Sequence, residues 1–230
     1  QQTMTQVLEK SLNTGVIFAK EKMGNSEFLR YIKKFGFGEK TGIELPETAG
    51  NLSNLSGKIK VNFHTASFGQ GINVTPVQLA QAYGALANGG KMMKPFIVRT
   101  RLTAEGKTIN TEPHEVRTVI SPKTAVLVSA MLVNVVENGH GQKAKVAGYD
   151  HEIAGKTGTA QVSKTTGAGY QEGVNIGSFA GYGPVQDPRF VMVVRVNHPR
   201  TVQFAESTAT PAFGEIAQFI LNYYNIPPHK

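Results

Sequence analysis

One stretch of ten residues, Ile153 to Val162, combines side chains that could recognise an anion. It reads IAGKTGTAQV, so a lysine stands between two glycines and two threonines follow it. Alternate side chains of a β-strand share a face, which would place the hydroxyls of Thr157 and Thr159 together, near the positive charge of Lys156. Glycine weakens a strand unless a ligand or another backbone must approach it closely. These residues therefore predict an open strand edge that receives a peptide ending in a carboxylate.

A second short pattern, Ser11-Leu12-Asn13, could act together with this strand. Each pattern alone is weak evidence, because three-residue combinations arise by chance in many chains. Ser11 could equally be a helix cap, and Lys156 could be a solvated lysine on the surface of a strand. Because Lys156 would lie on the surface of a strand, we expect its replacement by alanine to change stability by no more than ~0.5 kcal/mol.

The composition is that of a folded globular domain. The chain has 230 residues, of which 40% are hydrophobic and 17% charged, enough to bury a core. It has no cysteine, which excludes a disulfide framework and a thiolate zinc site. The longest apolar run, residues 190–194, is too short to cross a bilayer, and no signal peptide is visible at Gln1.

Several other function classes are disfavoured by the pattern of charges and histidines. The net charge of +8 is spread along the chain without a basic run or interleaved aromatic residues, so we predict no nucleic-acid partner. No two histidines have helical or zinc-finger spacing, and we predict no metal. His140 and His151 are interpreted as surface residues and not as catalytic bases, and the glycines at 167 and 169 lack a nucleotide-binding fingerprint. We expect no cofactor.

Helices dominate the predicted structure of the first 150 residues. Apolar periodicity indicates helices over residues 1–10, without a clear start signal, over 16–23, and over 26–35 with Ser26 as the cap. A capping hydroxyl followed by proline predicts a helix from Thr75-Pro76 to about residue 87, and another that follows Ser121-Pro122 and covers 125–136.

Less regular segments separate these helices. Residues 38–66 show no sustained period, and we expect a long surface excursion with short strands at most. Residues 95–103 and 107–111 flank Glu105-Gly106 and predict a hairpin.

The last third of the chain indicates a sheet. Strands are predicted over 152–162, 175–182 and 189–196, with a glycine-rich loop at 166–169 and a turn at 183–188, and a C-terminal helix begins at Thr210-Pro211. This order indicates an α+β fold in which helices flank an antiparallel β-sheet. We predict one domain, 1–230, with a helical part over about 1–150 and the sheet with the C-terminal helix over about 151–230.

Longer segments give the two short patterns a context. K-T-G and S-x-N belong, with S-x-x-K, to the signature set of penicillin-binding proteins and class A β-lactamases. The chain resembles the class B penicillin-binding proteins, the monofunctional transpeptidases that crosslink peptidoglycan. The resemblance extends over nearly the whole length and is carried by residues 11–46, 67–90, 152–161 and 178–189.

The sequence departs from this family in one respect. No serine of the chain is followed by a lysine three residues later, so the nucleophile of S-x-x-K is missing. In the family that motif lies upstream of S-x-N, and Ser11 is too near the start of the chain to leave room for it. We therefore expect a C-terminal part of a transpeptidase domain with a serine β-lactamase-like fold. Its nucleophile helix and first strands would be absent, and it would be inactive alone.

The resemblance also implies a role for each site residue. Ser11, Asn13 and Lys156 would be catalytic: the serine relays a proton, the asparagine binds the substrate amide, and the lysine holds the charge of the relay. Thr157, Gly158, Thr159 and Gln161 would bind substrate, with the Thr159 backbone N–H forming half of the oxyanion hole. The substrate would be a stem peptide ending in D-Ala-D-Ala, which could add to the strand edge, and β-lactams would react as its mimics.

Two other functions stay open at the level of sequence. The same fold could be a non-catalytic β-lactam or peptidoglycan sensor, or a β-lactamase or D,D-carboxypeptidase relative that hydrolyses the acyl-enzyme. The block from Gly69 to Gly90 favours the synthase class. The family further implies partners in the division or elongation machinery. It also implies a place at the outer face of the bacterial cytoplasmic membrane, with an anchor in a preceding N-terminal segment.

Overall fold

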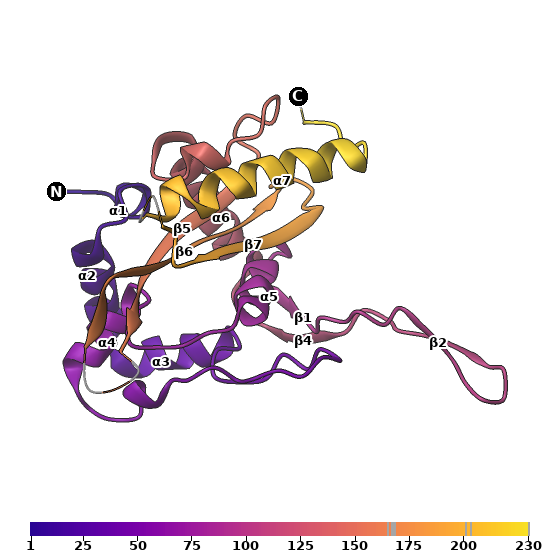
Figure 1. Cartoon of the computed structure of the whole chain (residues 1–230), viewed down its shortest axis with the longest axis horizontal. Coiled ribbons are helices and arrows are strands. Elements are labelled where there is room, and N and C mark those ends of the chain that lie inside the picture. Colours follow the sequence, from indigo (N-terminus) through magenta and orange to yellow (C-terminus); the bar gives the residue numbers. More distant parts are fainter. Residues whose placement is uncertain (165, 167–168, 201, 203, 230) are drawn as a thin grey trace.

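A three-stranded antiparallel sheet lies at the centre of the fold. The computed structural model describes residues 1–164, 166, 169–200, 202 and 204–229. The strands β5 (Ala154–Ser163), β6 (Tyr170–Gly183) and β7 (Phe190–Asn197) follow one another in the order β5-β6-β7, which makes β5 an edge strand. Helix α7 (Ala209–Tyr223) lies across one face of the sheet (Figure 1).

The remaining elements precede this sheet in the chain. The helices are α1 (Met4–Glu9), α2 (Asn13–Met23), α3 (Asn25–Lys34), α4 (Lys60–Ser67), α5 (Pro76–Ala87) and α6 (Pro122–Asn138). Short 3-10 turns occur at η1 (Ser53–Leu55), η2 (Gln142–Ala144) and η3 (Ala205–Ser207). No helix within the described ranges is both long and apolar enough to span a membrane.

Four short strands form two small antiparallel pairs. Strand β1 (Lys91–Met93) pairs with β4 (Glu115–Thr118), and β2 (Thr100–Leu102) pairs with β3 (Thr108–Asn110). The β2–β3 hairpin projects away from the body of the molecule (Figure 1). The small β1–β4 pair packs against α5 through the buried side chains of Ala85, Met92 and Val119.

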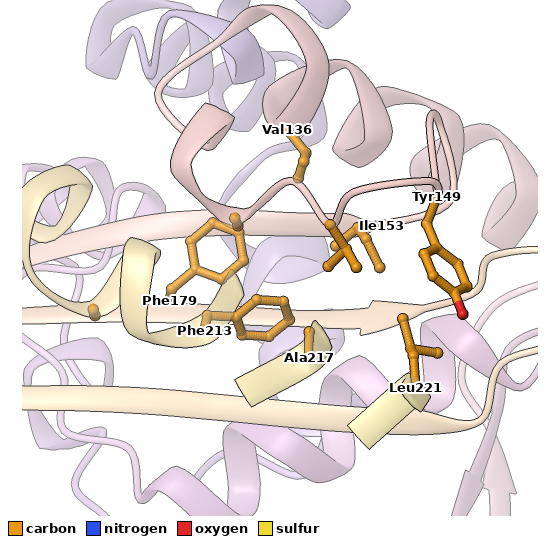
Figure 2. Close-up of a cluster of buried hydrophobic side chains, with 10 residues drawn as sticks. Val136, Tyr149, Ile153, Phe179, Phe213, Ala217 and Leu221 are labelled. Carbon is orange, nitrogen blue, oxygen red and sulfur yellow. The ribbon is translucent and has the colours of Figure 1, made fainter. Parts of the chain in front are cut away.

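The main core fills the space between the sheet and α7 (Figure 2). Phe179 of β6 and Phe213 of α7 are fully buried, with ring centroids 4.6 Å apart. Ala217 and Leu221 continue the same stripe of α7, one turn and two turns further along the helix. Because α7 covers β6 and β7, the apolar residues of these strands are withdrawn from water and the sheet becomes a rigid support.

The opposite face of the sheet packs against α5 and α6. Tyr182, three residues beyond Phe179 and on the other face, is fully buried beside Leu132 and Val133 of α6. The Tyr182 hydroxyl lies 2.5 Å from Ser129 Oγ, so its polar end has a partner inside the core. With helices on both faces, the sheet has its two edges at β5 and β7, and β5 is the edge strand that carries Lys156.

A buried amide attaches the irregular segment after α3 to this body. Gln78, on α5, has no exposed surface. Its Oε1 accepts from the backbone N–H of Thr75 at 2.8 Å, and its Nε2 donates to the carbonyls of Glu39 and Ala49 at 2.6 and 2.8 Å. Each polar atom of the side chain is therefore satisfied, which makes its burial affordable.

The predicted α+β fold, with an antiparallel sheet flanked by helices, is confirmed. The three strands of the last third, the hairpin about Glu105-Gly106 and the cap at Thr75 are present. The predicted division into a helical part and a sheet part of one domain stays a prediction, and the β1–β4 pair within the first part was not foreseen. Gly167 and Ala168 of the predicted glycine-rich loop lie outside the described residues.

Four details of the prediction are wrong. Residues 38–66 include all but the last residue of a helix, α4, which forms because Phe63 and Ala66 pack against Phe28 and Leu29. The cap of α3 is Gly24 and not Ser26, which lies inside the helix. Helix α7 begins at Ala209, so Thr210 lies inside it, and the Thr210 hydroxyl donates to Ala205 O at 2.8 Å instead of capping the helix.

The fourth error concerns the first helix, for which no start signal was recognised. Thr3 forms a capping box with Gln6: the Thr3 hydroxyl accepts from the Gln6 N–H, and the Gln6 side chain accepts from the Thr3 N–H at 2.9 Å. The pattern T-x-x-Q at residues 3–6 was the signal for this start.

The packing of α7 predicts a large contrast between two of its phenylalanines. Phe213→Ala should lower the free energy of unfolding by ~3–5 kcal/mol, because it leaves a cavity against Phe179. Phe219→Ala, at a side chain that is 66% exposed, should cost less than ~1 kcal/mol. Urea unfolding of both variants measures the difference, and equal losses would contradict this description of the core.

Candidate active site

Lys156 lies on the edge strand β5, and its amine contacts Ser11 in the turn after α1 and Thr157 of the same strand. Its Nζ donates to Ser11 Oγ at 2.9 Å, to Thr157 Oγ1 at 3.1 Å and to the Thr157 carbonyl at 3.3 Å. Burial lowers the pKa of Lys156 from its ordinary value of 10.5 to about 8. The reading of Lys156 as an ordinary solvated lysine is therefore wrong, because the sheet and the N-terminal helices withdraw it from water.

Ser11 ends α1 in a conformation that is unusual for serine. Its φ is +51°, in the left-handed region that glycine favours. The N–H of Leu12 donates to Val7 O at 2.9 Å and that of Ser11 to Leu8 O at 3.1 Å, which is the Schellman pattern of a helix end. Ser11 is thus the left-handed residue after α1. It does not cap α2, which begins after Leu12 without a side-chain cap.

A chain of packed elements places Ser11 beside Lys156. Helix α6 packs against β5 through Leu132 and Ala154, which share one buried cluster. Helix α1 in turn approaches the end of α6 at Gly139, where an added Cβ would lie 2.4 Å from the Glu9 carbonyl oxygen. No residue larger than glycine fits there. The short turn after α1 therefore has a fixed position against the edge of β5.

The hydroxyls of Thr157 and Thr159 each accept a hydrogen bond from the protein, which leaves their protons available to the cleft. Thr157 Oγ1 accepts from Lys156 Nζ, and Thr159 Oγ1 accepts from the Ala205 N–H at 3.1 Å. A hydroxyl that already accepts a hydrogen bond still has its own proton to donate. Thr157 pairs with Phe179 and Thr159 with Gly177 in the register of β5 and β6, so the two hydroxyls share a face, as predicted.

The packing of β5 on β6 favours glycine at position 158, whether or not a substrate binds there. An added Cβ at this position would lie 2.8 Å from Ser178 Oγ of the neighbouring strand. The Ser178 hydroxyl donates to the Gly158 carbonyl at 3.3 Å. A side chain at position 158 would therefore displace the Ser178 hydroxyl from this contact, and a role of Gly158 in admitting substrate stays a prediction.

These residues surround a polar cleft of about 460 Å³. Of the predicted site residues, Ser11, Asn13, Thr157, Gly158, Thr159 and Gln161 line it. Lys156 lies behind Ser11 and Thr157 and lines an adjoining hollow between β5 and the first two helices. The cleft also has lining residues that the sequence analysis did not identify: Phe68, Gln70, His140, Phe204 and Glu206.

His140 and Glu206 form one wall of the cleft. His140 Nδ1 lies 2.9 Å from Glu206 Oε2, and both side chains are about half exposed. His140 is therefore at the surface, as expected, but it also belongs to the cleft wall, which was not expected. His151 is exposed and lies away from the cleft, beside α6. Within the described ranges, no group of three or more His, Asp or Glu side chains could hold a metal ion.

The fold and the cleft together define a class of protein, and the comparisons with known proteins identify it. The family model of the penicillin-binding protein transpeptidase domain matches residues 1–218. The chain belongs to this family, and within it to part of the transpeptidase domain of the class B penicillin-binding proteins. The resemblance inferred from the sequence is confirmed.

Particular relatives show how much of such a protein the chain represents. It is 38% identical to stage V sporulation protein D of Bacillus subtilis, and the match covers 100% of this chain and 35% of that protein. It is 34% identical to penicillin-binding protein PbpB of Mycolicibacterium smegmatis, of which it covers 36%. The chain thus spans about a third of the length of these curated relatives.

Solved structures agree with the fold. The chain superposes with a TM-score of 0.90 on penicillin-binding protein 3 of Mycobacterium tuberculosis in complex with aztreonam, at 30% identity over 99% of this chain and 53% of that one. The transpeptidase domain of Burkholderia pseudomallei penicillin-binding protein 3 gives a TM-score of 0.84 at 31% identity, over 99% of this chain and 66% of that domain.

The left-handed conformation at position 11 predicts an order of stability among variants that lack the hydroxyl. Ser11→Gly should be more stable than Ser11→Ala by ~1 kcal/mol, because only glycine adopts this φ without strain. Both variants lose the hydrogen bond to Lys156, so the difference between their free energies of unfolding reports the cost of the left-handed backbone conformation. Urea unfolding measures it, and equal stabilities would argue against a strained Ser11.

The lowered pKa of Lys156 predicts a pH-dependent stability. Between about pH 8 and pH 10.5 the unfolded chain binds more protons at this lysine than the native protein does. The stability of the wild type should therefore rise relative to Lys156→Met across this window and stay parallel to it below pH 8. Lys164→Met, at an exposed lysine, is the control and should follow the wild type. A constant gap between wild type and Lys156→Met up to pH 10 would contradict the burial.

Proposed function

We propose that this chain is the substrate-binding part of a D,D-transpeptidase that crosslinks peptidoglycan by acyl-serine transfer. Its relatives include proteins named as probable peptidoglycan D,D-transpeptidases in Pseudomonas aeruginosa and Neisseria meningitidis. The observation that carries the proposal is the contact of Lys156 Nζ with Ser11 Oγ at 2.9 Å, beside the two threonine hydroxyls. It joins the S-x-N and K-T-G patterns in one cleft.

The cleft suits a substrate that ends in a carboxylate. The hydroxyls of Thr157 and Thr159 each accept a hydrogen bond from the protein and so present their protons to the cleft. The charge of Lys156 adds attraction for an anion behind them. In this proposal the terminal D-Ala carboxylate lies against the two threonines, and the Thr159 N–H supports the oxyanion of the penultimate carbonyl.

Ser11 and Lys156 are suited to move a proton. Ser11 Oγ accepts from the lysine, so its own proton can be given to the nitrogen of the departing D-Ala. A lysine with a pKa of about 8 changes its charge near neutral pH, which is where a relay between donor and acceptor is most effective. Asn13, the first residue of α2, offers its amide to the substrate peptide from the facing wall.

In this proposal the nucleophile of the reaction lies outside the 230 residues of the chain. No serine of the chain has a lysine three residues later, and the chain spans about a third of its curated relatives. The attacking serine would come from a segment outside these residues, lose its proton to its own lysine, and form an ester with the penultimate D-Ala as the terminal D-Ala leaves. An amine of a second stem peptide then replaces the serine oxygen and releases the enzyme.

The proposed function also implies ligands, partner proteins and a cellular location. β-Lactams would bind in the same cleft, as aztreonam and ampicillin are bound by penicillin-binding protein 3 of Mycobacterium tuberculosis. Other proteins of the division or elongation machinery would be its partners. The site of action would be the outer face of the bacterial cytoplasmic membrane, where peptidoglycan is assembled.

Binding of a substrate peptide tests this function. An N-acetylated peptide ending in D-Ala-D-Ala should bind these 230 residues and perturb the NMR signals of Gly158 and Thr159. Thr157→Val should weaken binding about tenfold, since it removes a hydrogen bond to a charged group. Thr108→Val, at an exposed strand threonine of the β2–β3 hairpin, is the matched control and should bind as the wild type does.

Two outcomes would count against the proposal. Equal affinity for peptides ending in D-Ala-D-Ala and in its amide would mean that the threonines do not bind the carboxylate. A stoichiometric penicillin adduct at the mass of the 230 residues would place a nucleophile inside the chain, and Ser11 would be the first candidate.

A further inference from the structure

A second groove continues the cleft beyond the end of the recognition strand. It has a volume of about 350 Å³ and shares two residues, Gln70 and Gln161, with the cleft. The end of β5 and the first half of β6 form one side of it, and the segments that precede and follow α4 form the other. The two hollows are therefore adjoining parts of one binding surface, and the second is reached from the first past Gln161.

The walls of this groove are rich in side-chain amides. The polar side chains that line it are Asn51, Ser53, Asn54, Gln70, Asn73, Gln161 and Tyr170, and no described lining residue is charged. Tyr170 exposes 40% of its surface. This composition differs from that of the cleft, where Glu206 and the neighbouring Lys156 supply charge.

The groove is held open by hydrogen bonds that leave donors and acceptors unused. The backbones of Asn51 and Asn73 are paired by two hydrogen bonds of 2.8 and 2.9 Å. Asn51 Oδ1 accepts from the Ser53 N–H at 2.8 Å, which leaves its Nδ2 to donate. Asn54 Nδ2 donates to Gly71 O at 2.7 Å, which leaves its Oδ1 to accept. The groove thus offers both kinds of polar group on a fixed frame.

We propose that this groove binds the N-acetylated sugar that carries the donor stem peptide. Acetamido and hydroxyl groups are neutral and need donors and acceptors together, which is what side-chain amides supply. An exposed tyrosine adds a flat apolar surface for a sugar ring. Ionised groups of a stem peptide would instead call for charged partners, which the described lining lacks. This inference rests on the proposed transpeptidase function and extends it to the glycan.

The distance from the reacting position agrees with this assignment. Along β5, the path from Thr159 to Ser163, which pairs with Tyr170, covers about 13 Å at ~3.3 Å per residue. An extended stem peptide gains ~3.3–3.6 Å per residue, so the penultimate D-Ala and about three residues before it cover the same path. A donor strand whose terminal D-Ala lies at Thr157 and Thr159 would therefore place its sugar at the Tyr170 end of the amide-lined groove.

Calorimetry with two ligands tests the proposal on the 230-residue chain. The disaccharide GlcNAc-MurNAc bearing a pentapeptide should bind about tenfold more tightly than the same N-acetylated pentapeptide, the gain of one or two neutral hydrogen bonds. Asn73→Ala and Tyr170→Ala should each reduce this gain and leave the affinity for the pentapeptide unchanged. Asn134→Ala, at a half-buried asparagine of α6 that lines neither the cleft nor the groove, is the matched control and should keep the full gain.

The outcomes separate this inference from the proposed function. If both ligands bind equally and Thr157→Val weakens both, the groove does not bind sugar but the transpeptidase proposal stands. If the pentapeptide alone shifts the NMR signals of Asn54, Asn73 and Tyr170, the groove is a peptide subsite and the inference is wrong. If the pentapeptide does not bind at all, the proposed function fails. In that case the sugar proposal is tested with chitobiose alone. An absence of shifts in the NMR signals of Asn54, Asn73 and Tyr170 would overturn it.

Discussion

The hydrogen bond between Lys156 and Ser11 joins residues that are 145 positions apart, and it depends on the packing of much of the structure. It requires β5 to keep one edge open while helices cover the two faces of the sheet. It also requires the turn after α1 to lie at that edge. The first condition is met by α7, α5 and α6, which cover the faces of the sheet. The second is met by the contact of α1 with the end of α6 at Gly139.

Both members of this pair are held in states that a free chain would avoid. Lys156 is partly withdrawn from water, which favours its neutral form and brings its pKa to about 8. Ser11 occupies a left-handed conformation that costs free energy for any residue with a side chain. The surrounding helices impose both conditions. The stability of the sheet and of α6 is therefore what makes this arrangement of Ser11 and Lys156 possible.

Sequence reasoning succeeded where the signals were local. The alternation around Lys156, the turn at 183–188 and the caps at Thr75 and Ser121 are properties of neighbouring residues, and each marked its element correctly. Helix α4 was missed because its periodicity is weak and its packing partners, Phe28 and Leu29, lie on another helix. His140 and Glu206 meet across 66 positions, and no local pattern announces such a pair. The left-handed Ser11 likewise follows from how α1 ends.

The β2–β3 hairpin has a different relation to the rest of the molecule. Its two strands pair with each other alone among the described strands, and most of their residues are exposed. Its connection to the body near Ile97 includes a hydrogen bond from that residue's N–H to Glu44. Neither the sheet nor the cleft depends on its length. Insertions and deletions during evolution can therefore accumulate in this hairpin, so that its length can differ between lineages while the geometry of the cleft is inherited unchanged.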